Sequence, residues 1–341
     1  MDQQIEELAV KDETPEEIKE SFSLKNFLRK NATQVGMIIV FFGIWLFFIL
    51  AAPNTFLSPQ IYYAFMATTP FFAVMALPLT MVIIAGEIDL SFPSVMAIGM
   101  VAFIFVFELT GNVALAIAAS LLAGIASGLL NGGLIVAIGI PSLVATLGTQ
   151  FFLRGLSLVL LEGRGATLVD AKESLVYTLL VGKTIGKIPN QFWWSILIAI
   201  ACWIVLNRTR LGAHIYLIGD NEQSARLMGV NVSRTRLAVF IIMGLAAAFA
   251  GVLASLQVSY FWPSLGEGYL LSTLASVFLG GTSVFGGVGT VLGTFLGSYI
   301  IGAINAGIVA VGMTGFWTEL IYGLIIIISI SMHVILQKRI K

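Results

Sequence analysis

The sequence predicts an all-α polytopic membrane protein of about ten transmembrane helices, some of them broken, with both termini in the cytoplasm. Of its 341 residues, 58% are hydrophobic and only 11% charged, whereas soluble domains have about 25% charged residues. Apolar runs of about 20 residues, enough to cross a bilayer as a helix, recur along the chain. Lysines and arginines gather near both chain ends and in one interior loop, as they do on the cytoplasmic side of membrane proteins.

The composition also excludes several classes of function. The formal net charge is zero, which gives no basis for nucleic-acid binding. Cys202 is the only cysteine, and neither His214 nor His333 has a cysteine at ligand spacing, so we expect no disulfide and no metal site. We find no catalytic constellation and therefore expect no enzyme and no catalytic residues.

Three domains follow from the distribution of charge. Residues 1–34 are rich in acidic side chains from Asp2 to Glu20 and end in a basic group (Lys25, Arg29 and Lys30), so we expect an acidic cytoplasmic tail. This tail lacks the basic start and short apolar core of a signal peptide. Residues 35–337 form the predicted transmembrane domain, and residues 338–341 a cytoplasmic basic tail.

The predicted spans follow from the length rule for apolar helices. In order they are 34–52, 61–85, 91–109, 112–138, 142–161, 192–206, 237–258, two spans within 269–312, and 316–336. An even number of spans places both basic ends in the cytoplasm with the arginine-rich loop 208–236, and leaves the loop 162–191 on the extracytoplasmic side.

Small residues recur at every fourth position on two spans, a pattern that lets helix backbones approach closely in lipid. They are Ala116, Ser120, Gly124, Gly128 and Gly132 on the fourth span, and Gly289, Gly293 and Gly297 on the ninth. We expect packing faces within the bundle, and a dimer interface is the alternative.

Two interruptions break the apolar pattern. The first, GEIDLSFP, carries Glu87, Asp89, Ser91 and Ser94, and Pro93 indicates that the helix breaks there. It is either an ordinary turn between spans or a break that lines a pathway or braces a partner. The second lies in the glycine-rich run LGGTSVFGGVGTVLG, with Thr282 and Ser283, and favours a discontinuous helix near a transport route.

Polar side chains inside the spans are further candidates for a translocation path. Asn131, Thr146, Thr149 and Gln150 either face such a path or make hydrogen bonds between helices. Arg154 lies well inside the fifth span, where we expect a structural pairing with Glu162 or another acid.

The loop 208–236 contains its own helix signals. Asp220 or Asn221 is a candidate N-cap, Gly229 is a candidate C′ residue, and about two turns lie between them. A helix this short needs a surface to pack on, so we expect a docking helix, with Ala225, Leu227 and Met228 as contacts.

These motifs together resemble the monosaccharide-type permeases of bacterial ABC importers, the ribose, galactoside and xylose group. The resemblance rests on 81–94 (MVIIAGEIDLSFPS), on the loop 211–232, on 275–297 and on 141–155 (PSLVATLGTQFFLRG), and it covers roughly residues 35–336. Within the loop, the positions that match are Gly219, Asn221, Glu222, Ala225, Arg226, Gly229 and Val230. The sequence departs from the family pattern at Glu87, Phe92 and Pro93, so we carry over no substrate preference.

The resemblance implies a homodimeric permease in the bacterial inner membrane that imports a monosaccharide or related polyol. Its partners would be cytoplasmic ATP-binding subunits, an extracytoplasmic sugar-binding protein and a second copy of itself or a homologous permease. This chain would bind no cofactor, because the partner subunits would use the ATP. The helix from Asp220 to Gly229 would be the coupling helix that docks on the ATPase.

Two other functions stay open on the residues alone. An ion-coupled secondary transporter of a small polar solute would use Glu87 and Asp89 as protonation sites, with a loop 208–236 that only fixes the topology. The other is a membrane scaffold without transport, which the polar breaks embedded in the spans disfavour, because a scaffold does not need them.

Overall fold

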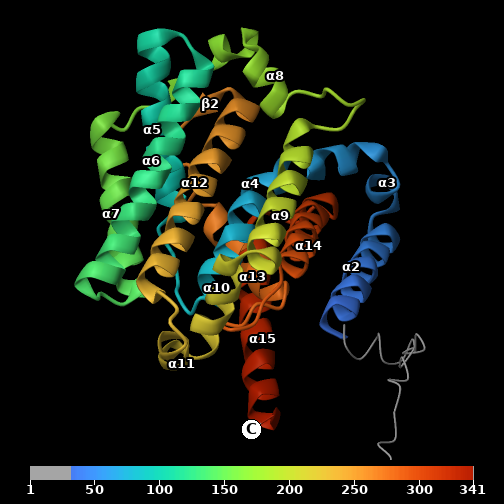
Figure 1. The fold of residues 1–341 in the computed structure, drawn as a ribbon. Helices are drawn as coiled ribbons and strands as arrows, with labels where there is room; N and C mark the ends of the chain where they lie inside the picture. Colours follow the sequence, from blue (N-terminus) through green and yellow to red (C-terminus); the bar gives the residue numbers. More distant parts are fainter. Residues whose placement is uncertain (1–31, 341) are drawn as a thin grey trace, which may run out of the picture.

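The computed structural model describes residues 32–340, and this part of the chain is almost entirely helical (Figure 1). Most of the predicted acidic tail and the final residue lie outside the described residues. Strands within 32–340 are limited to β1 (Ala166–Thr167) and β2 (Tyr260–Phe261), which pair antiparallel. The predicted all-α membrane fold is confirmed.

Every predicted span contains a helix. In order these are α2 (Ala32–Ala51), α4 (Pro59–Ile84), α5 (Phe92–Thr110), α6 (Val113–Gly133) with a short π-helical turn (Leu134–Ile138), α7 (Ser142–Leu160), α9 (Asn190–Arg208), α12 (Val232–Val258), α13 (Tyr269–Leu279), α14 (Val291–Ala310) and α15 (Phe316–Ile340). Shorter helices lie in the connections: α3 (Pro53–Phe56), a 3₁₀ turn (Val169–Glu173), α8 (Leu175–Val181), α10 (Arg210–Asp220) and α11 (Glu222–Leu227).

Seven helices in the described part are long and apolar enough to cross a membrane: α4, α5, α6 with its π-helical turn, α7, α9, α12 and α14. The helix α13 has 11 residues, so its length is about 16 Å, roughly half of the hydrocarbon thickness. It therefore does not cross alone, and the number of ten crossings stays a prediction.

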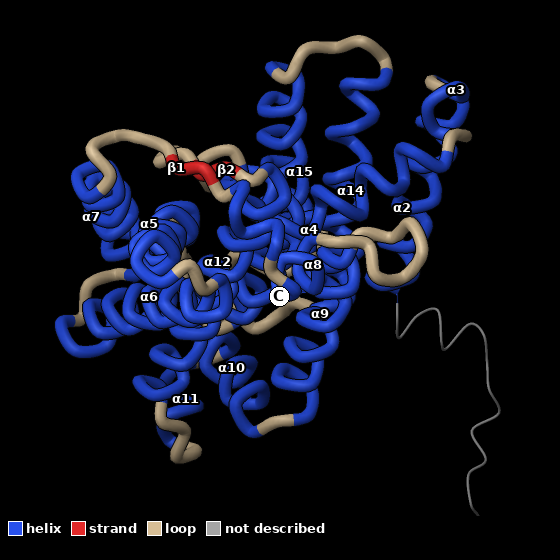
Figure 2. Tube along the Cα trace, turned by 90° about the horizontal axis from the view of Figure 1, so that it is seen from above, coloured by secondary structure: helices blue, strands red, loops and turns tan. Residues whose placement is uncertain are grey.

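The centre of the bundle is α4, in which every residue from Thr69 to Ile84 is buried. It packs against α9, α12, α13 and α14. Viewed along the bundle, α5, α6 and α7 lie on one side of α12, and α2 and α14 lie on the other (Figure 2). The helices α8 and α11 mark opposite ends of the bundle, and the chain ends at the α11 end (Figure 1).

The stripe of small residues on α6 packs against α12 of the same chain. A Cβ at Gly124 or Gly128 would overlap the backbone of Gly244 or Phe240, and Ser120 is fully buried. On α14, Gly293 and Gly297 meet the backbone of α13 in the same way. The predicted packing faces are confirmed, and neither stripe is free to form a dimer interface.

This close approach can be tested by adding one methyl group. Gly128→Ala should destabilise the protein by about 1–3 kcal/mol, since the new Cβ meets the Phe240 backbone and the two helices must separate. Gly148→Ala on α7 is the matched control, because nothing lies within 4 Å of its Cβ. Thermal unfolding in detergent measures both variants, and equal melting temperatures would contradict the packing.

Candidate functional site

The first part of the site is a compact corner formed by α10, α11 and the start of α12. Asn221 caps α11, because its side chain accepts a hydrogen bond of 2.9 Å from the Ser224 N–H. Gly229 follows the helix with a φ of +82°, a conformation that favours glycine. A small core (Ile218, Ala225, Val230 and Val232) holds the corner together. The predicted short helix, its N-cap at Asn221 and Gly229 at its end are confirmed, whereas α10 was not predicted.

The corner presents apolar side chains outward. Leu227 is 90% exposed and Met228 61% exposed, at the end of a helix whose inner face is already filled by Ala225. On the adjoining loop, Phe285 and Val288 are also more than half exposed. Large apolar side chains gathered on one end of the molecule indicate a surface that a partner covers.

Ion pairs tie α11 to α12. Glu222 binds Arg226 at 2.7 Å within α11 and Arg236 on α12 at 2.8 Å. Hydrogen bonds, first from Arg226 and then from Arg236, hold the pKa of Glu222 below its ordinary value, so this carboxylate is charged at neutral pH. The helix α11 therefore cannot shift without moving Arg236.

Arg236 continues the chain of charges into the first break. Its guanidinium also forms an ion pair with Glu87, which is 6% exposed and lies between α4 and α5. A buried carboxylate without a cation nearby would be costly, so this pairing explains how an acid is tolerated there. Glu222, Arg236 and Glu87 thus connect the exposed corner to the interior of the bundle.

The rest of the first break is held by hydrogen bonds to α6 and α7. Asp89 accepts bonds from the Ser91 N–H and hydroxyl at 2.7 and 2.6 Å, and Asn131 donates to the Ser91 hydroxyl at 2.7 Å. Asn131 in turn accepts from Thr149 at 2.6 Å. Asn131 and Thr149 therefore make hydrogen bonds between helices. This was one of the two roles predicted for them, the other being to face a translocation path.

The backbone of this break is satisfied by hydroxyl groups of α7. Ser142 and Thr146 accept from the N–H groups of Ile88 and Leu90, each at 3.1 Å. Thr146 also donates to the carbonyl of Ile88 at 3.2 Å. The break expected from the sequence is thus a non-helical segment, residues 85–91, and α5 begins with Pro93 in its first turn.

The second break, residues 280–290, meets the first at the end of α4. The carbonyl of Ile84 accepts from the Gly287 N–H at 2.9 Å, and a Cβ at Gly219 on α10 would overlap that same carbonyl. Tyr216 of α10 donates to the carbonyl of Gly289 at 2.8 Å. The second break is therefore bonded to α10 and to the end of α4, against which α10 also packs, and the discontinuity predicted in the glycine-rich run is present.

The remaining predicted residues are not joined to this network. Ser94 is buried on α5 and Thr282 in the second break, and both hydroxyls lack a hydrogen-bond partner among residues 32–340. The Ser283 hydroxyl accepts from the N–H of Phe285, while Gln150 on α7 is half-buried. The Asp220 side chain is exposed, beside the second break.

Arg154 holds a different segment, at the start of α13. It donates to the carbonyls of Pro263 and Leu265, the latter at 3.1 Å, and pairs with Glu267 at 3.3 Å. The structural pairing is confirmed with Glu267, whereas Glu162 binds Arg164 at 2.9 Å. That the backbone of residues 263–267 lies against α7 was not predicted from the sequence.

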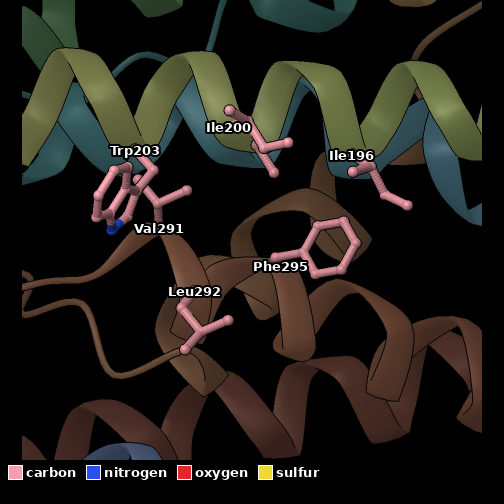
Figure 3. A pocket seen from close by; sticks show the side chains of 7 residues that line it. Ile196, Ile200, Trp203, Val291, Leu292 and Phe295 are labelled. Atoms are coloured by element: carbon pink, nitrogen blue, oxygen red, sulfur yellow. The ribbon is translucent and has the colours of Figure 1, made fainter.

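Cavities near the spans differ in chemistry. Between α9 and α14 lies a groove in which Ile200 and Trp203 face Leu292 and Phe295 (Figure 3). Its walls are apolar, so it suits lipid or hydrocarbon. A second cavity lies between α4, α13 and α14, and polar side chains such as Thr68, Tyr269 and Asn305 contribute to its lining.

Comparisons with known proteins agree with the motifs. A family model described as the branched-chain amino acid transport system / permease component matches residues 61–330. The ribose import permease protein RbsC of Escherichia coli (strain K12) is 31% identical over 259 residues, which cover 76% of this chain and 80% of that protein.

A second relative is the autoinducer 2 import system permease protein LsrD of Yersinia enterocolitica serotype O:8, 33% identical over 270 residues, with 76% of this chain and 81% of that protein covered. No solved structure matches the chain. The predicted resemblance to the monosaccharide-type permeases is therefore confirmed.

The link between the corner and the first break can be measured with a double-mutant cycle. Glu87→Gln and Arg236→Gln should show a coupling free energy of about 1–3 kcal/mol in unfolding, because Arg236→Gln leaves the buried Glu87 without its cation, while Glu87→Gln leaves Arg236 with Glu222 as its remaining partner. Arg226→Gln, at an exposed pair, should cost about 0.5 kcal/mol or less. Additive effects of the two substitutions would show that Glu87 and Arg236 do not interact.

Proposed function

We propose a function that builds on the family of the chain: it belongs to the branched-chain amino acid transport system permease components, whose model matches residues 61–330. The proposed function is that of the transmembrane permease subunit of an ATP-driven importer for a monosaccharide or related polyol. It forms part of the translocation path and couples to separate ATPase subunits, which hydrolyse the ATP, so it needs no cofactor of its own.

The observation that carries this proposal is the helix α11. It is too short to be stable alone, yet it is capped at Asn221, fixed to the bundle by Ala225 and by Glu222, and exposes Leu227 and Met228. This arrangement suits a coupling helix that docks apolar side chains in a groove of an ATPase subunit. Of the predicted coupling residues, Glu222 and Ala225 would fix the helix in place, while Arg226 would border the docking surface.

The same contacts supply a route for coupling. When two ATPase subunits close on ATP, the docked helices move with them. Here that movement would reach Arg236 through Glu222, then Glu87 in the first break, and the second break through Gly219 and Tyr216. The permease would respond as a set of rigid helices joined at two non-helical segments.

The relatives support a sugar-type substrate. RbsC is a ribose import permease and LsrD an autoinducer 2 import permease. We propose accordingly that the chain works with an extracytoplasmic binding protein, which selects the sugar and docks at the α8 end. A second copy of the chain, or a homologous permease, would complete the path in a bacterial inner membrane.

Docking can be tested at the most exposed side chain of the corner. Burial of a leucine is worth about 1.5–3 kcal/mol, so Leu227→Glu should weaken ATPase association about 10- to 100-fold. Leu175→Glu, 75% exposed on α8 at the opposite end, should leave association unchanged. Co-purification of the ATPase subunit measures both, and equal retention of the ATPase by the two variants would refute the docking assignment.

The transport function requires reconstitution. Proteoliposomes with this chain, the ATPase subunits and the binding protein should accumulate one sugar of a panel of pentoses and hexoses only when ATP is present on the ATPase side. Proteoliposomes with this chain alone and an imposed proton or sodium gradient should take up none. Gradient-driven uptake by the chain alone would instead favour the ion-coupled carrier, with Glu87 and Asp89 as the groups to examine.

A further inference from the structure

The feature behind this inference is the cavity between α4, α13 and α14, called the α13 cavity below. Its volume is about 480 Å³, within the range of about 300–1,000 Å³ of small-molecule sites. Polar side chains enter its lining from four elements: Thr55 of α3, Thr68 and Thr69 of α4, Tyr269 of α13 and Asn305 of α14. Convergence of polar groups from separate helices on one cavity is typical of a ligand site.

Most of these polar groups have no hydrogen-bond partner within the part of the chain that the structure describes. Among residues 32–340, no hydrogen bond reaches the Asn305 amide, the Tyr269 hydroxyl or the Thr55 hydroxyl. The Thr69 hydroxyl, on a residue that is 1% exposed, is also unpaired in the wall where α4 meets Gly302. A buried hydroxyl such as that of Thr69 is almost always hydrogen-bonded, and the other three groups are partly or fully exposed at the cavity, so the unpaired groups together indicate a polar occupant.

Asn305 gives the strongest argument. It lies on α14, one of the helices apolar enough to span the membrane, and its side chain is exposed rather than packed. An amide that faces hydrocarbon without a partner is costly. Its position on the α13 cavity resolves this cost, because water or a polar solute there supplies the missing hydrogen bonds.

The lining also indicates what kind of solute fits. Its aromatic residues are Phe65, Phe71, Phe72 and Tyr269, with Phe71 and Tyr269 in edge contact at 6.2 Å, and none of its residues is Asp, Glu, Lys, Arg or His. Without charged groups the cavity offers no counter-ion to a zwitterionic amino acid. Hydroxyl and amide groups beside aromatic rings suit an uncharged polyol, which has both hydroxyl groups and an apolar ring face.

The polar residues predicted from the sequence on α6 and α7 are engaged elsewhere. Asn131 and Thr146 bond the first break, Thr149 bonds Asn131, and the groove between α9 and α14 in Figure 3 is apolar. We therefore propose that the α13 cavity is a transit site for the transported sugar, an uncharged pentose or hexose, with Asn305 and Tyr269 as its hydrogen-bonding groups. This inference rests on the proposed function and deepens it.

The position of the cavity connects it to the coupling route. Tyr269 is the first residue of α13, and the other end of α13 enters the second break, which Tyr216 of α10 fastens. Thr273, one turn further along α13, is buried and unpaired as well. A movement of α10 would therefore shift α13 and change the polar groups that the solute meets.

A cysteine assay tests the site in the assembled transporter. The only native cysteine, Cys202, is buried, so Cys202→Ala gives a thiol-free background. In that background, Asn305→Cys should react with a membrane-impermeant charged thiol reagent, because the thiolate forms only where water is present. The sugar that the wild-type assembly takes up should slow the reaction at least threefold. Leu122→Cys, on the exposed face of α6, should react little.

Each result of this assay decides the proposal. Reaction slowed by the transported sugar supports a transit site. No reaction, as expected of a side chain covered by lipid or a second subunit, overturns it, and so does reaction that the sugar does not slow. If the wild-type assembly takes up no sugar with ATP, the proposed function is refuted. If it takes up a sugar but that sugar does not slow the reaction of the thiol at position 305, only the transit site is refuted.

A second variant pair does not depend on an introduced cysteine. Tyr269→Phe removes only a hydroxyl that has no hydrogen-bond partner in the described part of the chain, whereas Tyr299→Phe removes one that shares a hydrogen bond of 3.0 Å with Ser195. If Tyr269 contacts the solute, Tyr269→Phe should lower uptake per ATP hydrolysed about 3- to 10-fold and leave the melting temperature unchanged. Tyr299→Phe should instead lower the melting temperature. Unchanged uptake in Tyr269→Phe would overturn the role of the phenol.

Discussion

The structure depends on one constraint: within a bilayer every backbone N–H and carbonyl group must find a partner inside the protein. Intact helices satisfy it by themselves, but the breaks at residues 85–91 and 280–290 do not. They are satisfied by Ser142 and Thr146 of α7, by the carbonyl of Ile84 at the end of α4, which accepts from Gly287, and by Tyr216 of α10. Because the partners come from α4, α7 and α10, the non-helical segments are also the places where distant parts of the chain are joined.

The position of the breaks also explains where the buried ion pair between Glu87 and Arg236 lies. Glu87 is buried next to a break, and its partner Arg236 belongs to the helix that follows the exposed corner. Removal of Arg236 would leave the buried Glu87 carboxylate without its cation, whereas removal of Glu87 would leave Arg236 paired with Glu222 alone, so separation of Glu87 from Arg236 is costly. The corner can therefore act on the interior through Glu222 and Arg236 without a continuous rigid helix between them.

Much of this could be predicted from the sequence, because membrane helices leave a strong hydropathy signal. The spans, both breaks, the N-cap of α11 and the packing of Gly124 and Gly128 all follow from local rules. The sequence did not reveal α10, the 11-residue length of α13 or the pairing of Arg154 with Glu267. Each of these depends on contacts between residues far apart in the chain. The same reason applies to polar residues of the spans. Asn131 was a candidate and Asn305 was not, and only the fold shows that Asn131 is bonded to Ser91 while the Asn305 amide has no hydrogen-bond partner among residues 32–340.

The burial of α4 has a consequence for biosynthesis. Its neighbours α9, α12, α13 and α14 are all encoded after it, and it contains two internal prolines, Pro70 and Pro78. A ribosome that adds about 5–20 residues per second needs tens of seconds to supply the last of them. During that interval α4 must reside in lipid or beside the insertion machinery with carbonyls that its prolines leave unbonded. The helix at the centre of the finished protein is thus among the first to be inserted and the last to be enclosed.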